Sequence, residues 1–153
     1  MRAPETVLAF DFGLKRIGIA SGDSLTRGAA PRPAAVSNTA GPDWEAIARE
    51  VRVLGPARLV VGAPYNVDGT DGAITAAART FAAELKRRFA LPVHLVDERF
   101  SSLEATAALK SRRASGERRR RVQRADIDSA AAAVILTRWF AGERHMNEGH
   151  DTR

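Results

Sequence analysis

Three acidic side chains occupy positions that the apolar pattern of this chain would otherwise assign to the core. In the run TVLAFDF, the two-residue alternation of a strand puts Asp11 on the face of Val7 and Ala9. A second apolar run, VHLVD, ends in an acidic residue and is followed directly by Glu98. Asp128 lies in the first turn of a helical pattern, on its apolar stripe. Three carboxylates therefore lie at the ends of apolar elements that must pack together.

If these three carboxylates converge, their mutual repulsion has to be relieved. At a separation of about 5 Å and an effective dielectric constant near ~20, two like charges repel by roughly 3 kcal/mol. The cluster therefore needs a bound cation or raised pKa values. Ligand sets of carboxylate oxygens favour Mg²⁺ or Mn²⁺. Two such ions can activate a water molecule and stabilise the leaving oxygen of a phosphodiester, so the pattern indicates nuclease chemistry.

Each acidic residue also has a simpler structural interpretation, which spacing alone leaves open. Asp11 could end a strand and begin a turn. Glu98 could pair with the adjacent Arg99. Asp128 could interact favourably with the dipole of its helix, as acidic residues in a first turn often do.

The elements that would position these carboxylates follow from the apolar periodicity. Two-residue alternation and short apolar runs predict five strands, at residues 6–12, 16–21, 27–38, 58–63 and 93–97. Pro31 and Pro33 confine the third strand to an edge or a bend. Helical spacing predicts four helices, at residues 42–54, at 72–89, from Ser101 onward, and at 127–140 with Asp126 as a cap.

This order of elements predicts an α/β fold. Three strands joined without helices form an antiparallel meander, and the later strands, each preceded by a helix, extend the sheet in parallel. The expected architecture is a mixed five-stranded sheet with helices on both faces. A Rossmann fold would alternate strands and helices from the start and carry a GxGxxG turn, and this chain does neither.

The length and composition indicate one soluble domain. The chain has 153 residues, which suits a single domain over residues 1–141 followed by a polar tail at 142–153. No apolar run approaches the roughly 20 residues of a membrane span, so we expect a cytoplasmic protein without a membrane partner. The chain has no cysteine, which excludes disulfides and thiolate metal sites.

The positive charge is concentrated in one segment. Residues 111–124, SRRASGERRRRVQR, carry seven arginines and one glutamate and account for the whole net charge of +6. A block of this kind favours a polyanion through phosphate contacts and counterion release. The alternative is a solvated, flexible linker. The segment contains no aromatic residue, which argues for recognition of a nucleic-acid backbone rather than stacking on bases.

Four motifs resemble one known family. DFGLKRIGIA, VVGAPYNVDGT, DERFSS and DIDSAAAAVIL occur in the order and at the spacing of the YqgF/RuvX family, over about residues 7 to 141. This resemblance implies an RNase H-like fold and a metal-dependent nuclease site. Its catalytic and metal-binding carboxylates would be Asp11, Glu98 and Asp128. Asp97 is the second choice to Glu98, because strand alternation sends the two side chains to opposite faces.

The resemblance also implies substrates and partners. Family members are associated with processing of the 5′ end of pre-16S rRNA in ribosome biogenesis, and alternatively with Holliday junction resolution. The expected partners are therefore pre-rRNA or branched DNA, and the precursor of the small ribosomal subunit. A junction resolvase is expected to be a symmetric homodimer, whereas a processing nuclease can be a monomer.

Several further residues are candidate contacts to nucleic acid. They are Lys15, Arg16, Asn66, Asp68, Arg99, Arg112, Arg113, Arg118, Arg119, Arg120, Arg121 and Arg124. An exposed hairpin tip would explain Lys15 equally well, a plain turn would explain Asp68 equally well, and a salt bridge is the alternative for Arg99. The chain departs from the usual family pattern at a few positions. Leu14 replaces a threonine in the turn, and the other replacements are Ala63, Tyr65 and Phe100.

Two rival functions remain open from the sequence. DFGLKRIGIA also resembles the phosphate-binding hairpin of phosphotransferases of the actin and sugar-kinase type, but these need a second lobe for which 153 residues leave no room. The other rival is a non-catalytic RNA-binding assembly factor, which would bind RNA tightly without metal and would not cleave it.

Overall fold

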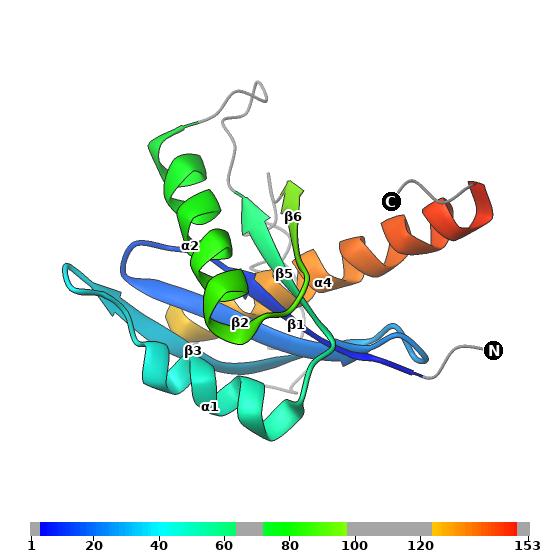
Figure 1. Cartoon of the computed structure of the whole chain (residues 1–153), viewed down its shortest axis with the longest axis horizontal. Helices are drawn as coiled ribbons and strands as arrows, with labels where there is room; N and C mark the ends of the chain where they lie inside the picture. Colours follow the sequence, from blue (N-terminus) through cyan, green and yellow to red (C-terminus); the bar gives the residue numbers. More distant parts are fainter. Residues whose placement is uncertain (1–3, 64–71, 98–123, 150–153) are drawn as a thin grey trace, which may run out of the picture.

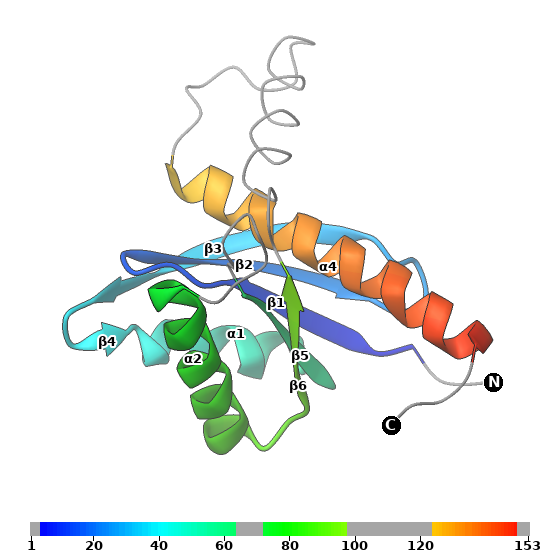
Figure 2. The same cartoon turned by 90° about the horizontal axis from the view of Figure 1, so that it is seen from above.

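Helices cover both faces of a mixed β-sheet (Figure 1). This computed structural model describes residues 4–63, 72–97 and 124–149. Helices α1 (Trp44–Leu54) and α2 (Ala73–Phe89) lie on one face of the sheet, and helix α4 (Arg124–Gly149) lies on the other (Figure 2). None of the helices in these ranges is long and apolar enough to cross a bilayer.

The sheet has the predicted mixed topology. Its strands are β1 (Thr6–Asp11), β2 (Arg16–Asp23), β3 (Ala29–Asn38), β4 (Gly41–Pro42), β5 (Arg58–Ala63) and β6 (Val93–Asp97), in the spatial order β4-β3-β2-β1-β5-β6. The first four strands pair antiparallel, and β1–β5 and β5–β6 pair parallel. A sixth strand, β4, adds to the expected five, because two residues are too short to produce a periodic pattern.

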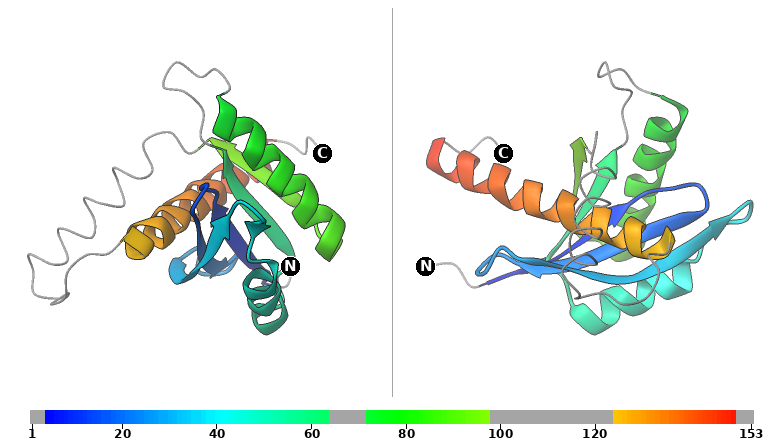
Figure 3. Two further views of the ribbon diagram at one scale, coloured as in Figure 1. Left: turned by 90° about the vertical axis from the view of Figure 1, so that its left-hand side faces the viewer. Right: turned by 180° about the vertical axis from the view of Figure 1, so that it is seen from behind.

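The helices agree with the sequence predictions except at the ends of α4. Asp43 is the N-cap of α1, and its carboxylate accepts a hydrogen bond of 3.1 Å from the amide of Ala46. Helix α4 begins at Arg124, so Asp126 is inside the helix rather than its cap. The same helix continues to Gly149 through much of the expected polar tail, and its end extends past the sheet (Figure 3). Polarity was a poor guide here, since glutamate, arginine and methionine are good helix formers. The helix predicted from Ser101 lies outside the described residues.

Two apolar cores lie on opposite faces of the sheet. The first, against α1 and α2, includes Leu8, Phe10, Ile17, Ile19, Ile47, Leu59, Val61, Phe81 and Leu85. The second, against α4, consists of Val7, Ala9, Val60, Ile135, Leu136 and Phe140. The two sets alternate along β1, as the sequence predicts. The alternation assigns Asp11, the last residue of β1, to the face that α4 covers.

One glycine lets α4 approach β2 closely. A Cβ atom at Gly22 would lie 2.2 Å from the carbonyl oxygen of Gly28 and 3.1 Å from Cδ2 of Leu136. The first contact is with backbone, which cannot move away as a side-chain end can. Any larger residue at position 22 would therefore push apart β2, the following connection and the helix.

We expect Gly22→Ala to lower the free energy of unfolding by about 1–3 kcal/mol, the usual cost of overpacking a core. Urea unfolding monitored by circular dichroism measures this change. Gly142→Ala is the matched control, because position 142 is exposed in α4 and a Cβ there would meet nothing within 4 Å. The control should instead gain up to about 1 kcal/mol of stability. Equal stability of the two variants would contradict this account of Gly22.

Candidate functional site

Asp11 lies at the end of the sheet where the three parallel strands β1, β5 and β6 have their carboxyl ends. In the register of these strands, Asp11 of β1 is opposite Gly62 of β5, which is opposite Val96 of β6. Asp11 is only 9% exposed. Ligand sites in open α/β sheets gather at the carboxyl ends of strands. Asp11 is therefore a largely buried carboxylate at the edge where a site is expected.

Glycines flank Asp11 on both neighbouring strands. Asp11 is in register with Gly18 of β2 and with Gly62 of β5. Side chains at such positions normally stand about 5 Å apart on the same face of the sheet. Because both neighbours are glycines, no side chain from β2 or β5 stands directly beside Asp11 on this face of the sheet. A carboxylate at this position supplies the oxygen ligand that Mg²⁺ and Mn²⁺ prefer.

The first turns of α4 are hydrogen-bonded to the sheet close to Asp11. The buried hydroxyl of Ser129 donates to the carbonyl oxygen of Arg32 at 2.7 Å. The same hydroxyl accepts a hydrogen bond from the amide of Ile19 at 3.5 Å. Ile19 directly follows Gly18, the register partner of Asp11. The backbone of Asp128, the residue before Ser129, therefore belongs to a helical turn that is attached to β2 one residue beyond the register partner of Asp11.

Sequence reasoning missed Ser129 although it lies within the motif DIDSAAAAVIL. The available signal was a single hydroxyl at the start of an alanine-rich run. Small side chains suffice for close packing, so a serine among alanines indicates a hydrogen-bonding requirement.

The turn between β1 and β2 holds a basic residue at the same edge. A Cβ atom at Gly13 would lie 2.6 Å from the carbonyl oxygen of Arg16, so the turn is tight at this point. The carbonyl of Lys15 accepts a hydrogen bond of 2.8 Å from the amide of Ser37 in β3. The side chain of Lys15 is exposed, and that of Leu14 is 61% exposed. The turn therefore presents a lysine and an apolar side chain to solvent beside the end of β1.

The other predicted site residues divide into two groups. Asp97 is the last residue of β6 and pairs with Ala63, while Asp128 and Arg124 belong to α4. Outside the described residues lie Glu98, Asn66, Asp68, Arg99, Arg112, Arg113, Arg118, Arg119, Arg120 and Arg121. Within the described ranges, no three His, Cys, Asp or Glu side chains gather closely enough to hold a metal ion. The convergence of the three carboxylates stays a prediction.

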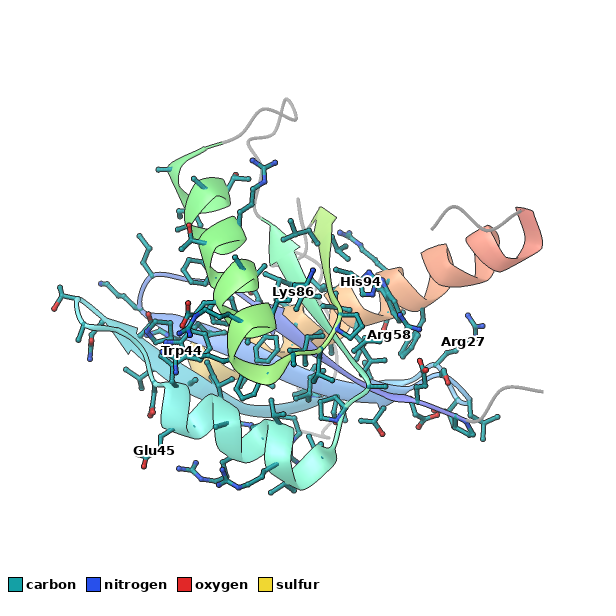
Figure 4. The ribbon with its side chains drawn as sticks, in the orientation of Figure 1. Arg27, Trp44, Glu45, Arg58, Lys86 and His94 are labelled. Carbon is teal, nitrogen blue, oxygen red and sulfur yellow. The ribbon has the colours of Figure 1, made fainter. Side chains whose placement is uncertain are left out.

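Several cations elsewhere take part in the fold. Arg27 donates to the carbonyl of Phe140 at 2.8 Å, and Arg58 pairs with Glu5 at 2.9 Å and lies 3.5 Å from His94 (Figure 4). Both lie toward the end of the sheet opposite Asp11, where β1 begins. These arginines connect structural elements, so they are weaker candidates for substrate contacts than Lys15.

Comparisons with known proteins find relatives over nearly the whole chain. A family model described as "RuvX: Holliday junction resolvase" matches residues 5–142. A protein of Xanthomonas campestris pv. campestris (strain B100), named "Putative pre-16S rRNA nuclease", is 47% identical over 143 residues, 92% of this chain and 90% of the relative. A protein of the same name from Legionella pneumophila subsp. pneumophila is 43% identical over 133 residues, 87% of this chain and 93% of the relative.

Solved structures share the fold at low identity. The structure of T. thermophilus RuvC in complex with a Holliday junction substrate has a TM-score of 0.52 and 16% identity, covering 92% of this chain and 96% of that chain. The yeast mitochondrial Holliday junction resolvase Ydc2 has a TM-score of 0.54 and 10% identity, covering 94% and 80%. At these low identities, the structural likeness establishes the fold alone. This shared fold confirms the predicted RNase H-like fold class.

The space beside Asp11 can be tested with Gly62→Ala. A methyl group on β5 would occupy part of this space, so we expect Mn²⁺ affinity to fall by about tenfold, within the range known for residues that surround metal ligands. Isothermal titration calorimetry measures the affinity, and Gly142→Ala should bind Mn²⁺ like the wild type. Unchanged affinity in Gly62→Ala would show that no cation occupies the space between β1 and β5.

Proposed function

The chain belongs to the RuvX family of phosphodiester-cleaving enzymes, and we propose that it is a metal-dependent nuclease that processes the 5′ end of pre-16S rRNA during ribosome biogenesis. The proposal is supported above all by the position of Asp11, a buried carboxylate at the carboxyl ends of the parallel strands, with glycines as its register neighbours on both adjacent strands. Two relatives above 40% identity carry the corresponding name and cover most of the chain.

We assign the metal ligands to Asp11, Glu98 and Asp128. Val96 packs in the apolar cluster on the α4 side of the sheet, and it is in register with Gly62 and, through it, with Asp11. Alternation along the strand direction therefore favours position 98, rather than position 97, for the face of Asp11. Asp128 is supported by the attachment of Ser129 next to Gly18.

The proposed roles of the three carboxylates are binding and orientation. Their negative charges attract divalent cations. Cations bound at this site would hold the scissile phosphate at one place relative to the protein. Bound Mg²⁺ or Mn²⁺ supplies activation of water and stabilisation of the leaving oxygen. The limited exposure of Asp11 restricts the access of bulk water to its carboxylate, which strengthens its interaction with a cation.

Nucleic acid would be held by cations at the Asp11 edge. Lys15 and Arg16 follow Asp11 in the chain, and the turn that carries Lys15 is fixed to β3. We propose that they contact phosphates together with Arg99 and the arginines of residues 111–124, and that Asn66 and Asp68, which follow β5 in the chain, also contact the nucleic acid. The substrate would be the pre-rRNA within the precursor of the small ribosomal subunit, in the cytoplasm.

Holliday junction cleavage is the second candidate. Its support is the description of the matching family model and the shared fold with RuvC bound to a junction. Both substrates present a bent or branched phosphodiester backbone to the same carboxylates. A homodimer would favour the junction, because a junction has two symmetric cleavage positions.

Asp11→Asn is expected to lower cleavage at least about a hundredfold, because loss of a metal ligand removes several kcal/mol of transition-state stabilisation. The assay follows Mg²⁺- or Mn²⁺-dependent cleavage of a pre-16S rRNA leader and of a four-way DNA junction. Asp23→Asn is the matched control, since Asp23 is the acidic last residue of β2, at the opposite end of the sheet, and accepts a hydrogen bond from the amide of Thr26. If wild type cuts neither substrate, or Asp11→Asn cuts as well as Asp23→Asn, the proposed function is wrong.

Replacing the seven arginines of residues 111–124 with serine should weaken RNA binding and flatten its dependence on salt. Each lost phosphate contact is expected to reduce the slope of log affinity against log salt by about 0.7 to 0.9. Fluorescence anisotropy over a range of salt concentrations measures the slope. Arg49→Ser with Arg52→Ser, both exposed on α1, is the control for loss of surface charge. Binding and slope that match the control would assign the segment to a linker.

A further inference from the structure

Strands β2 and β3 are interrupted by a bulge near the proposed site. Their register passes from Ile17 opposite Ala35 to Ile19 opposite Arg32, so two steps along β2 correspond to three along β3. The extra residue lies in a stretch of β3 that contains Pro33, which has no amide hydrogen to donate. A bulge disrupts the local ladder, so backbone groups there need other partners.

The hydroxyl of Ser129 supplies a partner to both strands. It donates to the carbonyl of Arg32 at 2.7 Å and lies 3.5 Å from the donating amide of Ile19. A hydroxyl can donate and accept at the same time, so one side chain serves a donor on β2 and an acceptor on β3. Serine is short, so these two hydrogen bonds are possible only if the helix backbone lies close to the bulge. They therefore fix both the depth and the rotation of α4 at this point.

The bulge is also held from the other face of the sheet. The guanidinium of Arg32 pairs with Glu50 of α1, with 2.8 Å between Nε and Oε1. Glu50 is only 9% exposed, and its hydrogen bond and charge raise the pKa of Arg32. Arg32 is thus bound through its carbonyl to α4 and through its side chain to α1. Because both faces hold the same residue, the bulge cannot shift along the strands without breaking one of these contacts.

The packing around Ser129 shows that its hydroxyl is not needed to fill space. Ser129 is 3% exposed, and Ala131 and Ala132 on the following turn are fully buried against the sheet. An alanine at position 129 would therefore pack at a similar distance. What alanine would remove is the pair of hydrogen bonds to β2 and β3.

We infer that Ser129 is a positioning residue, whose hydrogen bonds to the β2–β3 bulge place the start of α4 so that position 128 lies beside Asp11. Gly18 is the register partner of Asp11 and adjoins Ile19, and Asp128 adjoins Ser129. The two carboxylate positions are thus connected through a single hydrogen bond and its neighbouring residues. The catalytic consequence rests on the proposed function, whereas the geometric one does not.

The test combines proximity with kinetics. The chain has no cysteine, so Asp11→Cys with Asp128→Cys introduces the only two thiols, and a short bis-maleimide reports their proximity in the folded protein. In this background we expect Ser129→Ala to slow cross-linking by about tenfold, through loss of its two hydrogen bonds. In the chain with both aspartates intact, Ser129→Ala should lower kcat by about 10- to 100-fold and leave KM unchanged, as expected for a residue that orients metal ligands.

Two controls separate positioning from stability. Thr137→Ala removes a hydroxyl from an exposed position of the same helix, where it bonds only within α4 to the carbonyl of Ala133. Gly22→Ala destabilises the contact between α4 and the sheet at the far end of β2. In the double-cysteine chain, both controls should cross-link at the rate of the chain without the control substitution. In the chain with both aspartates intact, both controls should have the kcat of the wild type.

The outcomes are distinct. Unchanged cross-linking in Ser129→Ala would overturn the inference, and so would a loss of cross-linking no larger than that in Gly22→Ala. Slower cross-linking with unchanged kcat would also overturn it, since the hydroxyl would then have only a structural role. If wild type cleaves nothing while Ser129→Ala still slows cross-linking, the positioning stands and the nuclease proposal fails.

Discussion

Asp11 places an ionisable carboxylate among side chains that are otherwise apolar, and much of the surrounding structure depends on accommodating it. Its neighbours on the same face of β1 are Val7 and Ala9, both fully buried. A buried carboxylate is costly unless it is paired, hydrogen-bonded or bound to a cation. Gly18 and Gly62 place no side chain beside it from the two adjacent strands. The strand register thus puts the smallest residues beside the one charged group on this face of β1.

Helix α4 is held against the sheet by different means at two places along its length. Near Asp11, the hydroxyl of Ser129 forms hydrogen bonds to both strands of the bulge. Toward the opposite end of β2, the absence of a side chain at Gly22 allows Leu136 and Phe140 to pack closely. Hydrogen bonds specify position, whereas apolar contact supplies most of the stabilising free energy. This division suits a helix that must bring one residue to a defined place.

The sequence predicted the elements more readily than their connections. Strands β5 and β6 match the predicted runs 58–63 and 93–97, because short apolar runs bounded by glycine and proline are strong local signals. The face of Asp11 followed from alternation along β1. Strand β4 was missed, because two residues carry no periodicity. The ends of α4 were misplaced, because polarity does not distinguish an exposed helix from a tail.

The environment of Asp11 could not be read in the same way. Gly18 and Gly62 lie 7 and 51 residues from Asp11 along the chain, and only the strand register makes them its neighbours. Ser129 finds its partners on β2 and β3 for the same reason. Periodicity shows which residues are buried, but it does not identify the hydrogen-bond partners that burial brings together. Glu98 and Asp128 therefore remain predicted partners of Asp11.

The central claim is that carboxylates from β1, from the segment after β6 and from the start of α4 together form one cation-binding site. Anomalous diffraction from crystals soaked in Mn²⁺ tests it most directly, because the signal locates the metal independently of any activity assay. The account predicts an anomalous peak bonded to the carboxylate of Asp11, with Glu98 and Asp128 as further ligands. A peak bonded to other residues, or ordered Asp11, Glu98 and Asp128 side chains without a peak between them, would contradict it.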